Sequence, residues 1–576
     1  MKPKLNPEAK AVHRAILSEI RRRLSLPGSE AHLERFSLTN DPAELRRRQA
    51  YLREGLSKVR PEMRGLISKV KPIRFQREFL NDRVLLVDES EVEEAESLNL
   101  CHVTTDVEEA REYPIVLSTL GYGVDVELKP QEIAPELYIL PLWRNRETLE
   151  ALARIGELTG EGSVAPRMLE ALKEFEEVMG REKLLESLDE LIAEKERELN
   201  ERIGERLENF SLTLSGKELL SFLSQLREGN YDAIFRHFSD VEEEILELIN
   251  EAERDLSERL GVTVELGIEE LYPIRVPGER VEELRNLLER ELALERYLKA
   301  RKILDEIGPL IPRLKEELER VHELDFLLAV REFTEGFSFP EIWSDGIAFL
   351  RGRHIFIENP QPVSYAIGRK PEGFSAPGAE RINDEDVVIL TGANSGGKTS
   401  LLELVTQVEV LFHMGFPVPA ERAWLEPLDE LFFFRRKRSV YGAGAFETAL
   451  KSFVRALRGA GRKLILIDEF EAVTEPGAAV KIIGELLKVA HERGFRVVIV
   501  SHLGEDLKKE LPFARVDGIE AKGLDENLNL IVDRQPVFGK LGRSTPELIV
   551  ERLARKARGK DREIYERILK SFRQNV

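Results

Sequence analysis

The sequence predicts a multidomain α+β protein in which long helical arms precede an α/β domain. The chain has 576 residues, which is more than one hydrophobic core normally organises. Residues 146–340 are rich in charged side chains and carry leucines at helical spacing, which is typical of long paired helices. Farther along, short apolar runs end in a glycine-rich loop or in acidic residues, as the parallel strands of an α/β domain do.

Residues 1–65 are predicted to form an N-terminal helical core segment. The stretch Asn-Asp-Pro-Ala-Glu at 40–44 is typical of a helix start, because a capping side chain precedes a proline in the first turn. Between 66 and 145 the pattern changes to short apolar runs, such as 83–87 and 113–117, separated by glycine and proline turns. This stretch is therefore predicted to be a small α/β or β-rich unit.

The 146–340 region is predicted to form helical lever arms packed as an antiparallel coiled coil. Narrow apolar stripes on otherwise charged helices favour pairing of two helices over burial in a large core. The stretch 211–280 lies between the two stripes and is expected to form a clamp-like tip. The apolar positions of the stripes are Leu185, Leu188, Ile192, Leu199, Ile203 and Leu207 in the first helix, and Leu284, Leu287, Leu294, Leu298 and Ile307 in the second.

Residues 391–400 contain a phosphate-loop motif. Gly392, Gly397, Lys398 and Thr399 fill the pattern G-x-x-x-x-G-K-[ST], between an apolar strand-like run and a helix-like stretch. Backbone N–H groups at such a helix start bind phosphate, the lysine neutralises its charge, and the threonine hydroxyl holds Mg²⁺. The predicted nucleotide-binding residues of this loop are Gly392, Ala393, Asn394, Ser395, Gly396, Gly397, Lys398, Thr399 and Ser400.

Two later strands are predicted to bring catalytic side chains to the same loop. The apolar run 464–467 ends in Asp468 and Glu469, which is a Walker B arrangement. Asp468 is expected to bind Mg²⁺ together with Thr399, and Glu469 to orient and deprotonate the attacking water. A third run ends in Ser501 and His502, and His502 is the candidate sensor of the γ-phosphate. The sequence therefore predicts an ATPase that uses ATP and Mg²⁺.

Composition limits the remaining possibilities. The net charge of −20 argues against a protein coated with nucleic acid, although local basic runs occur. No apolar run approaches the ~18 residues that a membrane-spanning helix needs, and no signal peptide opens the chain, so we expect a cytoplasmic protein without membrane contact. The single cysteine, Cys101, excludes an intramolecular disulfide and is best explained as a small buried residue.

Over about 353–557 the motifs resemble those of the MutS proteins, and the stretches at 468–479 and 542–544 resemble motifs of the second branch of that family, MutS-II. The phosphate loop is close to the family's G-P-N-x-G-G-K-[ST], with Ala393 in place of the proline. Arg353-His354 is similar to the pair that opens the family's ATPase domain. The further similar segments are Met-Gly-Phe-Pro-Val-Pro-Ala at 414–420, the acidic and Thr-x-Pro stretch at 468–479, and Gly-Arg-Ser at 542–544.

This resemblance implies an ABC-type P-loop ATPase domain over 341–545 and a C-terminal helical tail, 546–576, that takes part in dimerisation. It implies a homodimer that binds branched, junction, distorted or mismatched double-stranded DNA, is associated with the nucleoid, and acts in DNA repair or recombination control. Tyr365 is a candidate for stacking on adenine, although packing in the core is the favoured alternative. The candidate DNA contacts in the arm tip are Arg227, Arg236 and His237.

The sequence also departs from the family. Where family members carry Ser-Thr-Phe in the segment that one subunit presents to its partner's nucleotide, this chain has Gly444, Ala445 and Phe446, so the hydroxyls are missing. Glu471 and Val473 replace a glycine pair after the acidic residues. No mismatch-reading domain is visible, and no C-terminal nuclease domain of the Smr type is expected, so we predict no nuclease activity.

Two other classes of ATPase also carry both nucleotide motifs. A chromosome-maintenance ATPase of the SMC or Rad-fifty kind would separate the two nucleotide motifs by a long coil, whereas Lys398 and Asp468 are close here and both follow the arms. An ABC-class ATPase unrelated to DNA would carry a Leu-Ser-Gly-Gly-Gln signature between the motifs, and nothing of that form occurs between Ser400 and Leu464. Both remain alternatives to the MutS-like assignment.

Overall fold

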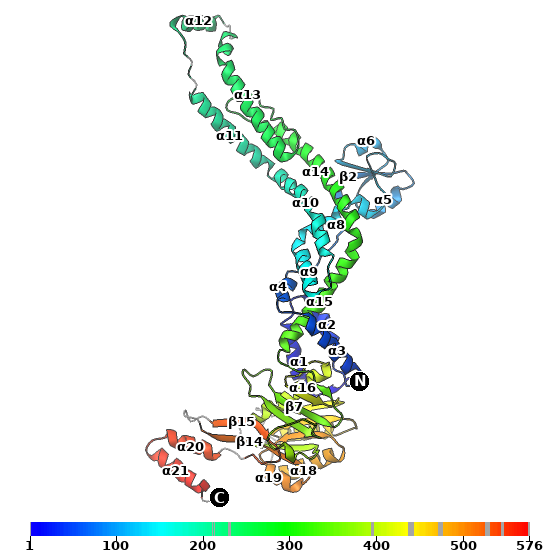
Figure 1. Cartoon of the computed structure of the whole chain (residues 1–576), viewed down its shortest axis with the longest axis vertical. Coiled ribbons are helices and arrows are strands. Elements are labelled where there is room, and N and C mark those ends of the chain that lie inside the picture. Colours follow the sequence, from blue (N-terminus) through cyan, green and yellow to red (C-terminus); the bar gives the residue numbers. More distant parts are fainter. Residues whose placement is uncertain are drawn as a thin grey trace. The chain divides into compact units, whose positions relative to one another are not determined.

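The computed structural model has several sheets and many long helices (Figure 1), which confirms the predicted mixed α and β class. The chain divides into two compact units. We call Met1–Ser68 with Glu319–Val576 the core unit, and Lys69–Leu318 the arm unit. The structure describes residues 2–209, 211, 213–228, 232–392, 397–435, 443–469, 476–524, 530–542 and 546–573.

The core unit is built on a seven-stranded sheet of order β1-β11-β12-β13-β9-β14-β15. All neighbouring strands run parallel except the last pair. The central strands β12, β13 and β9 are buried over nearly their whole length and consist mainly of Val, Ile and Leu, as strands with both faces covered do. In sheet order the strands are β1 (Lys4–Leu5), β11 (Glu430–Phe434), β12 (Lys463–Asp468), β13 (Arg496–Val500), β9 (Val387–Gly392), β14 (Arg515–Leu524) and β15 (Leu530–Val537).

Helices pack against this sheet through alternate strand residues. Ile389, Ile467 and Ile499 lie in one buried cluster with Phe453 and Ile483 from two of the helices. Another helix, α16, contacts β9, β12 and β13 and begins at the carboxyl end of β9. The sheet therefore positions the start of α16 beside the carboxyl ends of β9, β12 and β13. The helices are α16 (Lys398–Met414), α17 (Ala443–Ala456), α18 (Pro476–Glu492) and α19 (Gly504–Glu510).

The N-terminal segment contributes an edge strand to this sheet, which the sequence analysis did not predict. Lys4 pairs with Glu430, and the Asn6 side chain both donates to and accepts from the backbone of Phe433, at 2.8 and 3.1 Å. A two-residue strand is too short to show a sequence period, so its backbone pairing can be seen only in the fold. The helices that follow are α1 (Pro7–Arg21), α2 (Glu30–Glu34), α3 (Pro42–Lys58) and α4 (Met63–Ile67).

The core unit also contains a second, mainly antiparallel sheet of order β6-β10-β7-β8. Its strands are β6 (Glu341–Ile342), β7 (Gly346–Gly352), β8 (Val363–Gly368) and β10 (Arg422–Leu425). At the C-terminal side, α20 (Pro546–Lys556) and α21 (Lys560–Arg573) pack on each other (Figure 1). The long helix α15 (Ile311–Phe333) crosses from the arm unit into the core unit.

The arm unit includes a small parallel sheet of order β3-β2-β4-β5. One face packs on α14 through Ala293 and Tyr297. The buried Arg83 guanidinium on β2 forms two hydrogen bonds with the Glu136 carboxylate of α8, at 2.6 and 2.9 Å. The elements are β2 (Leu80–Leu86), α5 (Val92–Leu98), β3 (Cys101–Thr104), α6 (Val107–Ala110), β4 (Ile115–Ser118), β5 (Val124–Asp125), α7 (Pro130–Ile133) and α8 (Glu136–Arg144).

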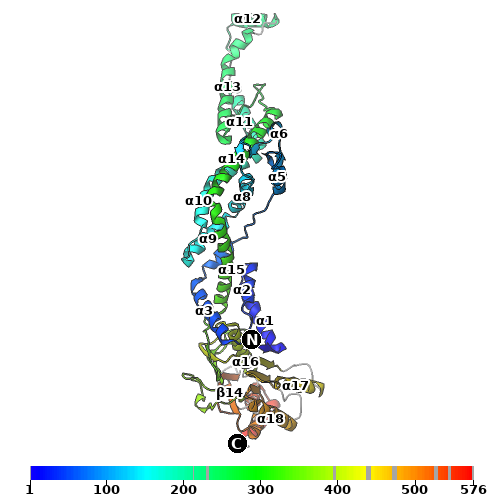
Figure 2. The same cartoon turned by 90° about the vertical axis from the view of Figure 1, so that its right-hand side faces the viewer.

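The rest of the arm unit is helical. The predicted stripe on α11 is buried at Leu188, Ile192, Leu199 and Ile203, and it packs mainly on α13, which lies beside α11 in both views (Figures 1 and 2). Among the described residues, no helix has an apolar stretch long enough to cross a membrane. The helices are α9 (Arg146–Thr159), α10 (Ala165–Glu186), α11 (Leu188–Asn209), α12 (Gly216–Arg227), α13 (Asp232–Leu260) and α14 (Gly278–Ile307).

The prediction that the second stripe forms one apolar packing face is wrong in part. Leu287 and Leu298 of α14 are 43% and 47% exposed, whereas Leu288 and Leu292 are buried. The buried face rotates along α14 because its partners change: Leu288 belongs to the α11 and α13 cluster, while Tyr297 packs on the small sheet. In addition, α13 lies within the stretch expected to be the tip but pairs with α11 instead.

Candidate nucleotide site

The predicted phosphate loop lies between β9 and α16, as the motif requires. Gly392 ends β9 with a φ of 118°, and a Cβ there would collide with the Ile519 carbonyl oxygen, so only glycine fits. Gly397 has a φ of 83° and precedes the first turn of α16. Four of the predicted loop residues, Ala393, Asn394, Ser395 and Gly396, lie outside the described residues.

Lys398 begins α16 and is 4% exposed. Its Nζ donates a hydrogen bond of 2.8 Å to the Gly392 carbonyl oxygen. The ammonium group therefore links the start of α16 to the end of β9, and the first turn of an α-helix generally has N–H groups without an intrahelical partner. Thr399 and Ser400 follow in the same helical turn. A buried cation at a helix start is suited to an anionic phosphate.

Thr399 and Asp468 meet as the motifs predict. The Thr399 hydroxyl donates a hydrogen bond of 2.9 Å to Asp468 Oδ2, which joins α16 to the end of β12. The other carboxylate oxygen, Oδ1, is buried and has no partner among the described residues. Burial raises the pKa of Asp468, and the Thr399 hydrogen bond opposes that shift. One unpartnered carboxylate oxygen next to a hydroxyl is a donor set that fits Mg²⁺.

Glu469 and His502 are also brought together. Glu469 Oε1 lies 3.1 Å from His502 Nε2, and the Glu469 amide donates to the Val500 carbonyl oxygen. Glu469 has a φ of 49°, which is uncommon for a residue with a side chain and costs about 1 kcal/mol or more. Glu469 directly follows β12, and its carboxylate contacts His502, the second residue after β13. Such strain is frequent at functional sites.

Two cationic residues near the loop were not identified from the sequence as site residues. Arg534 on β15 approaches the loop, because a Cβ placed on Gly397 would lie 3.4 Å from its Cδ. Arg435 follows β11 and forms an ion pair with Glu403 of α16. The sequence showed Arg435 only as the start of a basic run. Arg435 is the residue after β11, whose register with β12 places it beside Asp468, and this register is visible only in the fold.

Tyr365 lies in the core. It is 1% exposed, and its ring centroid is 5.9 Å from that of Phe538. This is the packing alternative that the sequence favoured. Stacking on adenine would require the buried ring to become accessible, so that role stays a prediction.

Gly444, Ala445 and Phe446 lie in the first turn of α17, but their side chains are outside the described part of the chain. The segment comes between β11 and β12 in the sequence, and Asp468 ends β12. Its predicted action across a subunit interface stays a prediction. The Gly-Arg-Ser match at 542–544 is described only at Gly542, whose amide donates a 2.8 Å hydrogen bond to the Thr391 hydroxyl.

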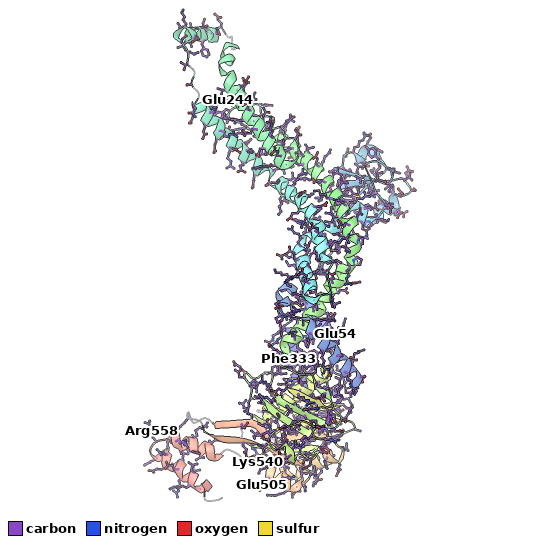
Figure 3. All side chains as sticks on the ribbon, in the orientation of Figure 1. Glu54, Glu244, Phe333, Glu505, Lys540 and Arg558 are labelled. Atoms are coloured by element: carbon purple, nitrogen blue, oxygen red, sulfur yellow. The ribbon has the colours of Figure 1, made fainter. Side chains whose placement is uncertain are left out.

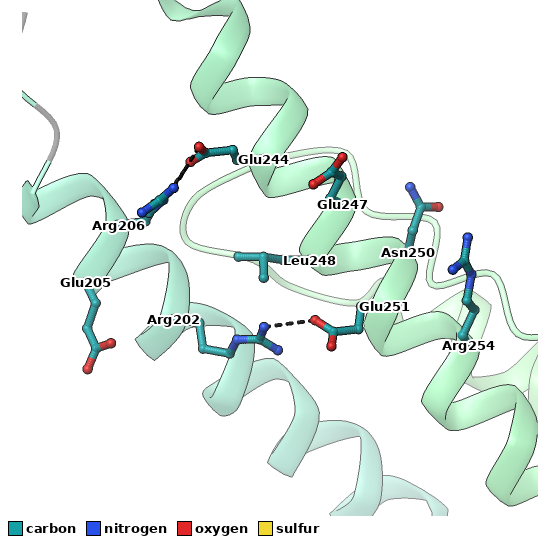
Figure 4. A pocket seen from close by; sticks show the side chains of 9 residues that line it. All are labelled: Arg202, Glu205, Arg206, Glu244, Glu247, Leu248, Asn250, Glu251 and Arg254. Atoms are coloured by element: carbon teal, nitrogen blue, oxygen red, sulfur yellow. Dashed lines mark hydrogen bonds and ion pairs between the residues drawn. The ribbon is translucent and has the colours of Figure 1, made fainter.

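The candidate DNA contacts are on the arm helices. Arg227 is exposed at the end of α12, while Arg236 and His237 are on α13 and their side chains lie outside the described residues. Nearby, α11 and α13 border a groove of about 690 Å³ (Figure 4). In this groove Arg202 forms an ion pair with Glu251 at 2.8 Å, and Arg206 forms one with Glu244 at 2.6 Å. Glu244 is labelled among all side chains in Figure 3. Both arginine side chains are about half exposed, and each guanidinium has further N–H donors besides those that bind the glutamate.

Comparisons with known proteins include a match over nearly the whole chain. The chain is 57% identical over 571 residues to the DNA-binding protein MutS2 of Pyrococcus furiosus, and this match covers 99% of the chain and 100% of that protein. It is 25% identical over 389 residues to the DNA mismatch repair protein MutS of Thermotoga maritima, covering 67% of the chain and 44% of that protein. It is also 28% identical over 222 residues to the Endonuclease MutS2 of Caldicellulosiruptor saccharolyticus, covering 35% and 26%. No family model matches the chain.

Proposed function

Because the chain belongs to the MutS2 family, we propose that it is a homodimeric, Mg²⁺-dependent ATPase that binds branched or distorted double-stranded DNA and changes its grip with nucleotide state. Its relative from Pyrococcus furiosus is named a DNA-binding protein. The observation that carries the ATPase part is the Thr399–Asp468 hydrogen bond, which joins the two nucleotide motifs at one point. DNA repair or recombination control is the process in which we place it.

The side chains of the site have distinct roles in this proposal. Lys398 neutralises phosphate charge, and the N-terminus of α16 supplies N–H donors. Thr399 and Asp468 would hold Mg²⁺, which supplies charge neutralisation to the phosphates. Glu469 orients the attacking water and takes its proton, while His502, 3.1 Å from Glu469, holds that carboxylate and senses the γ-phosphate. Together these residues support hydrolysis within residues 341–545, our proposed ATPase domain.

We place DNA contacts on the arm, at Arg227, Arg236 and His237, and dimerisation partly on 546–576. Contacts between basic side chains and phosphates position a protein on DNA without reading its sequence. A protein that holds the duplex by such contacts recognises the shape of the DNA. The net charge of −20 confines these contacts to local sites, because phosphate binding requires nearby Lys and Arg.

We expect tighter binding to a four-way junction than to a linear duplex with a single mismatch, because backbone contacts sense shape and carry little base information. The measurement is a gel-shift or anisotropy titration of homoduplex, mismatched, forked and four-way DNA at one physiological salt concentration. Arg227→Glu with Arg236→Glu is expected to weaken binding to all four ligands by similar factors.

Arg259→Glu, at the other end of α13, is the matched control for this charge reversal and should leave the affinities near those of the parent. Equal or tighter binding to the mismatch than to the junction would contradict the proposed shape recognition. If the double charge reversal lowered the affinity for the four DNA ligands by unequal factors, Arg227 and Arg236 would contact more than the DNA backbone.

Restoring the family's hydroxyls should accelerate hydrolysis. We expect Gly444→Ser with Ala445→Thr to raise kcat by about ten- to a hundredfold, because a charge-assisted hydrogen bond made in the transition state contributes roughly 1.5–3 kcal/mol. Steady-state ATPase assays at saturating nucleotide test this expectation. The gain should still require Lys398.

Mixed dimers provide the control for action across the interface. When the restored subunit faces a partner that carries Lys398→Ala, the gain should disappear, because the restored hydroxyls would face a defective site. If the restored variant binds nucleotide and dimerises but hydrolyses no faster than the parent, this segment does not limit the chemistry.

A further inference from the structure

Arg435 and Asp468 are neighbours at the carboxyl edge of the main sheet. Phe434 of β11 pairs in register with Ile467 of the parallel strand β12, and the residue after Phe434 is Arg435. Asp468 follows Ile467 in the same way. Neighbouring strands in a sheet are about 4.8 Å apart, so the flexible Arg435 side chain has Asp468 within its reach. The backbone of Arg435 therefore lies beside that of Asp468, whose carboxylate is proposed to hold Mg²⁺.

The Arg435 side chain pairs with Glu403 instead. Glu403 is on α16, one helical turn after Thr399, and it is 20% exposed, whereas Arg435 is 46% exposed. Residues four apart lie on the same helix face, so Glu403 and Thr399 both face the ends of β11 and β12. The helix thus contacts one strand end through Thr399 and Asp468, and the other through Glu403 and Arg435.

Glu403 is itself held by His354. His354 Nδ1 accepts a 3.2 Å hydrogen bond from the Phe356 amide, which leaves the proton of the neutral ring on Nε2. Nε2 lies 2.8 Å from the second Glu403 oxygen and donates to it. Burial, assisted by the Arg435 charge, lowers the pKa of His354 to about 4, so the ring is neutral near pH 7. The neutral ring places no second cation beside Glu403, which forms its ion pair with Arg435.

We propose that Glu403 is a positioning residue that holds Arg435 away from Asp468, so that the Asp468 carboxylate stays accessible to a divalent cation. Without Glu403, the strand register leaves the Asp468 carboxylate within reach of Arg435, and Asp468 Oδ1 has no partner among the described residues. An Arg435–Asp468 pair would compete with the cation for that oxygen. This inference rests on the proposed function, because it assumes that Asp468 binds Mg²⁺.

Metal binding to the full chain tests the proposal without relying on turnover. Mn²⁺, observed by its electron paramagnetic resonance signal, is titrated in the presence of a non-hydrolysable ATP analogue. We expect Glu403→Gln to raise the Mn²⁺ dissociation constant about three- to fivefold, the range that a partly exposed ion pair supports. Arg435→Gln should bind Mn²⁺ at least as tightly as the parent.

The double variant Glu403→Gln with Arg435→Gln decides between positioning and a structural effect. It should bind Mn²⁺ like the parent, because the competing cation is gone. If it stays as weak as Glu403→Gln alone, Glu403 acts by supporting α16 and the proposal is wrong. Glu403→Asp keeps the charge and should stay near the parent value.

Glu485→Gln is the matched control, since it removes a carboxylate that pairs with Lys488 on α18, outside the site. It should not change Mn²⁺ affinity. A parent protein that binds neither Mn²⁺ nor the analogue would contradict the proposed function itself. A parent that binds both, with unchanged affinity in Glu403→Gln, would contradict only the inference about Glu403.

Discussion

Lys398→Ala is expected to reduce ATP hydrolysis to background and to weaken nucleotide binding. The ammonium group is buried at the start of α16 and donates to the Gly392 carbonyl oxygen at 2.8 Å. Its removal leaves the phosphate charge without a fixed cation, and loss of one such preorganised group typically costs at least about a hundredfold in rate. Phosphate release and binding of a fluorescent ATP analogue measure the two effects separately.

Glu469→Gln is the companion variant and should behave differently. Asp468, Thr399 and Lys398 remain, so nucleotide binding persists, while the attacking water loses its base. The variant should therefore retain ATP and accumulate a closed dimer, which size-exclusion chromatography with ATP would detect. Hydrolysis at the parent rate would show that Glu469 is not the base.

The largest expected effect on stability lies in the arm unit. Arg83 is 0% exposed, pairs with Glu136 of α8 and lies 5.3 Å from the Tyr297 ring centroid. Arg83→Met would remove the cation that makes two hydrogen bonds to the buried Glu136 carboxylate and leave it only the longer, 3.9 Å contact with Arg296. Removing one partner of a buried ion pair typically costs about 3–5 kcal/mol. We expect a lower unfolding midpoint in denaturant and faster hydrogen exchange in β2 and α8.

A double replacement provides the control for this ion pair. Arg83→Met with Glu136→Leu removes both charges, and it should recover most of the lost stability because apolar packing often substitutes for a buried pair. If Arg83→Met alone unfolds at the same denaturant concentration as the parent, the pair does not hold β2 to α8. Equal losses in the single and double variants would point to packing instead of charge.

The sequence predicted the parts of the site that local spacing encodes. Gly392, Lys398 and Thr399 must lie at a fixed, short spacing in the sequence for one loop to bind phosphate. Their pattern can therefore be recognised from the sequence alone. Asp468 was predictable because an apolar run precedes it and parallel strands end at one edge of a sheet. The Thr399–Asp468 hydrogen bond shows that the structure brings these two predicted residues together.

The features that the sequence did not predict depend on contacts between residues that are far apart in the sequence. The edge strand β1 is defined by its register with β11, and a two-residue strand has no period. The buried face of α14 rotates where its packing partners change, so Leu298 matched the stripe but is exposed. Arg435 lies beside Asp468 because of the register of β11 with β12, and no local spacing in the sequence records that register.

The coupling of DNA grip to nucleotide is the central claim, and one titration tests it most directly. The affinity for a four-way junction is measured at fixed salt for the parent, Lys398→Ala and Glu469→Gln, each with and without ATP and Mg²⁺. We predict that nucleotide changes the affinity of the parent and of Glu469→Gln, and leaves that of Lys398→Ala unchanged. Identical junction affinities with and without nucleotide in all three proteins would contradict the account.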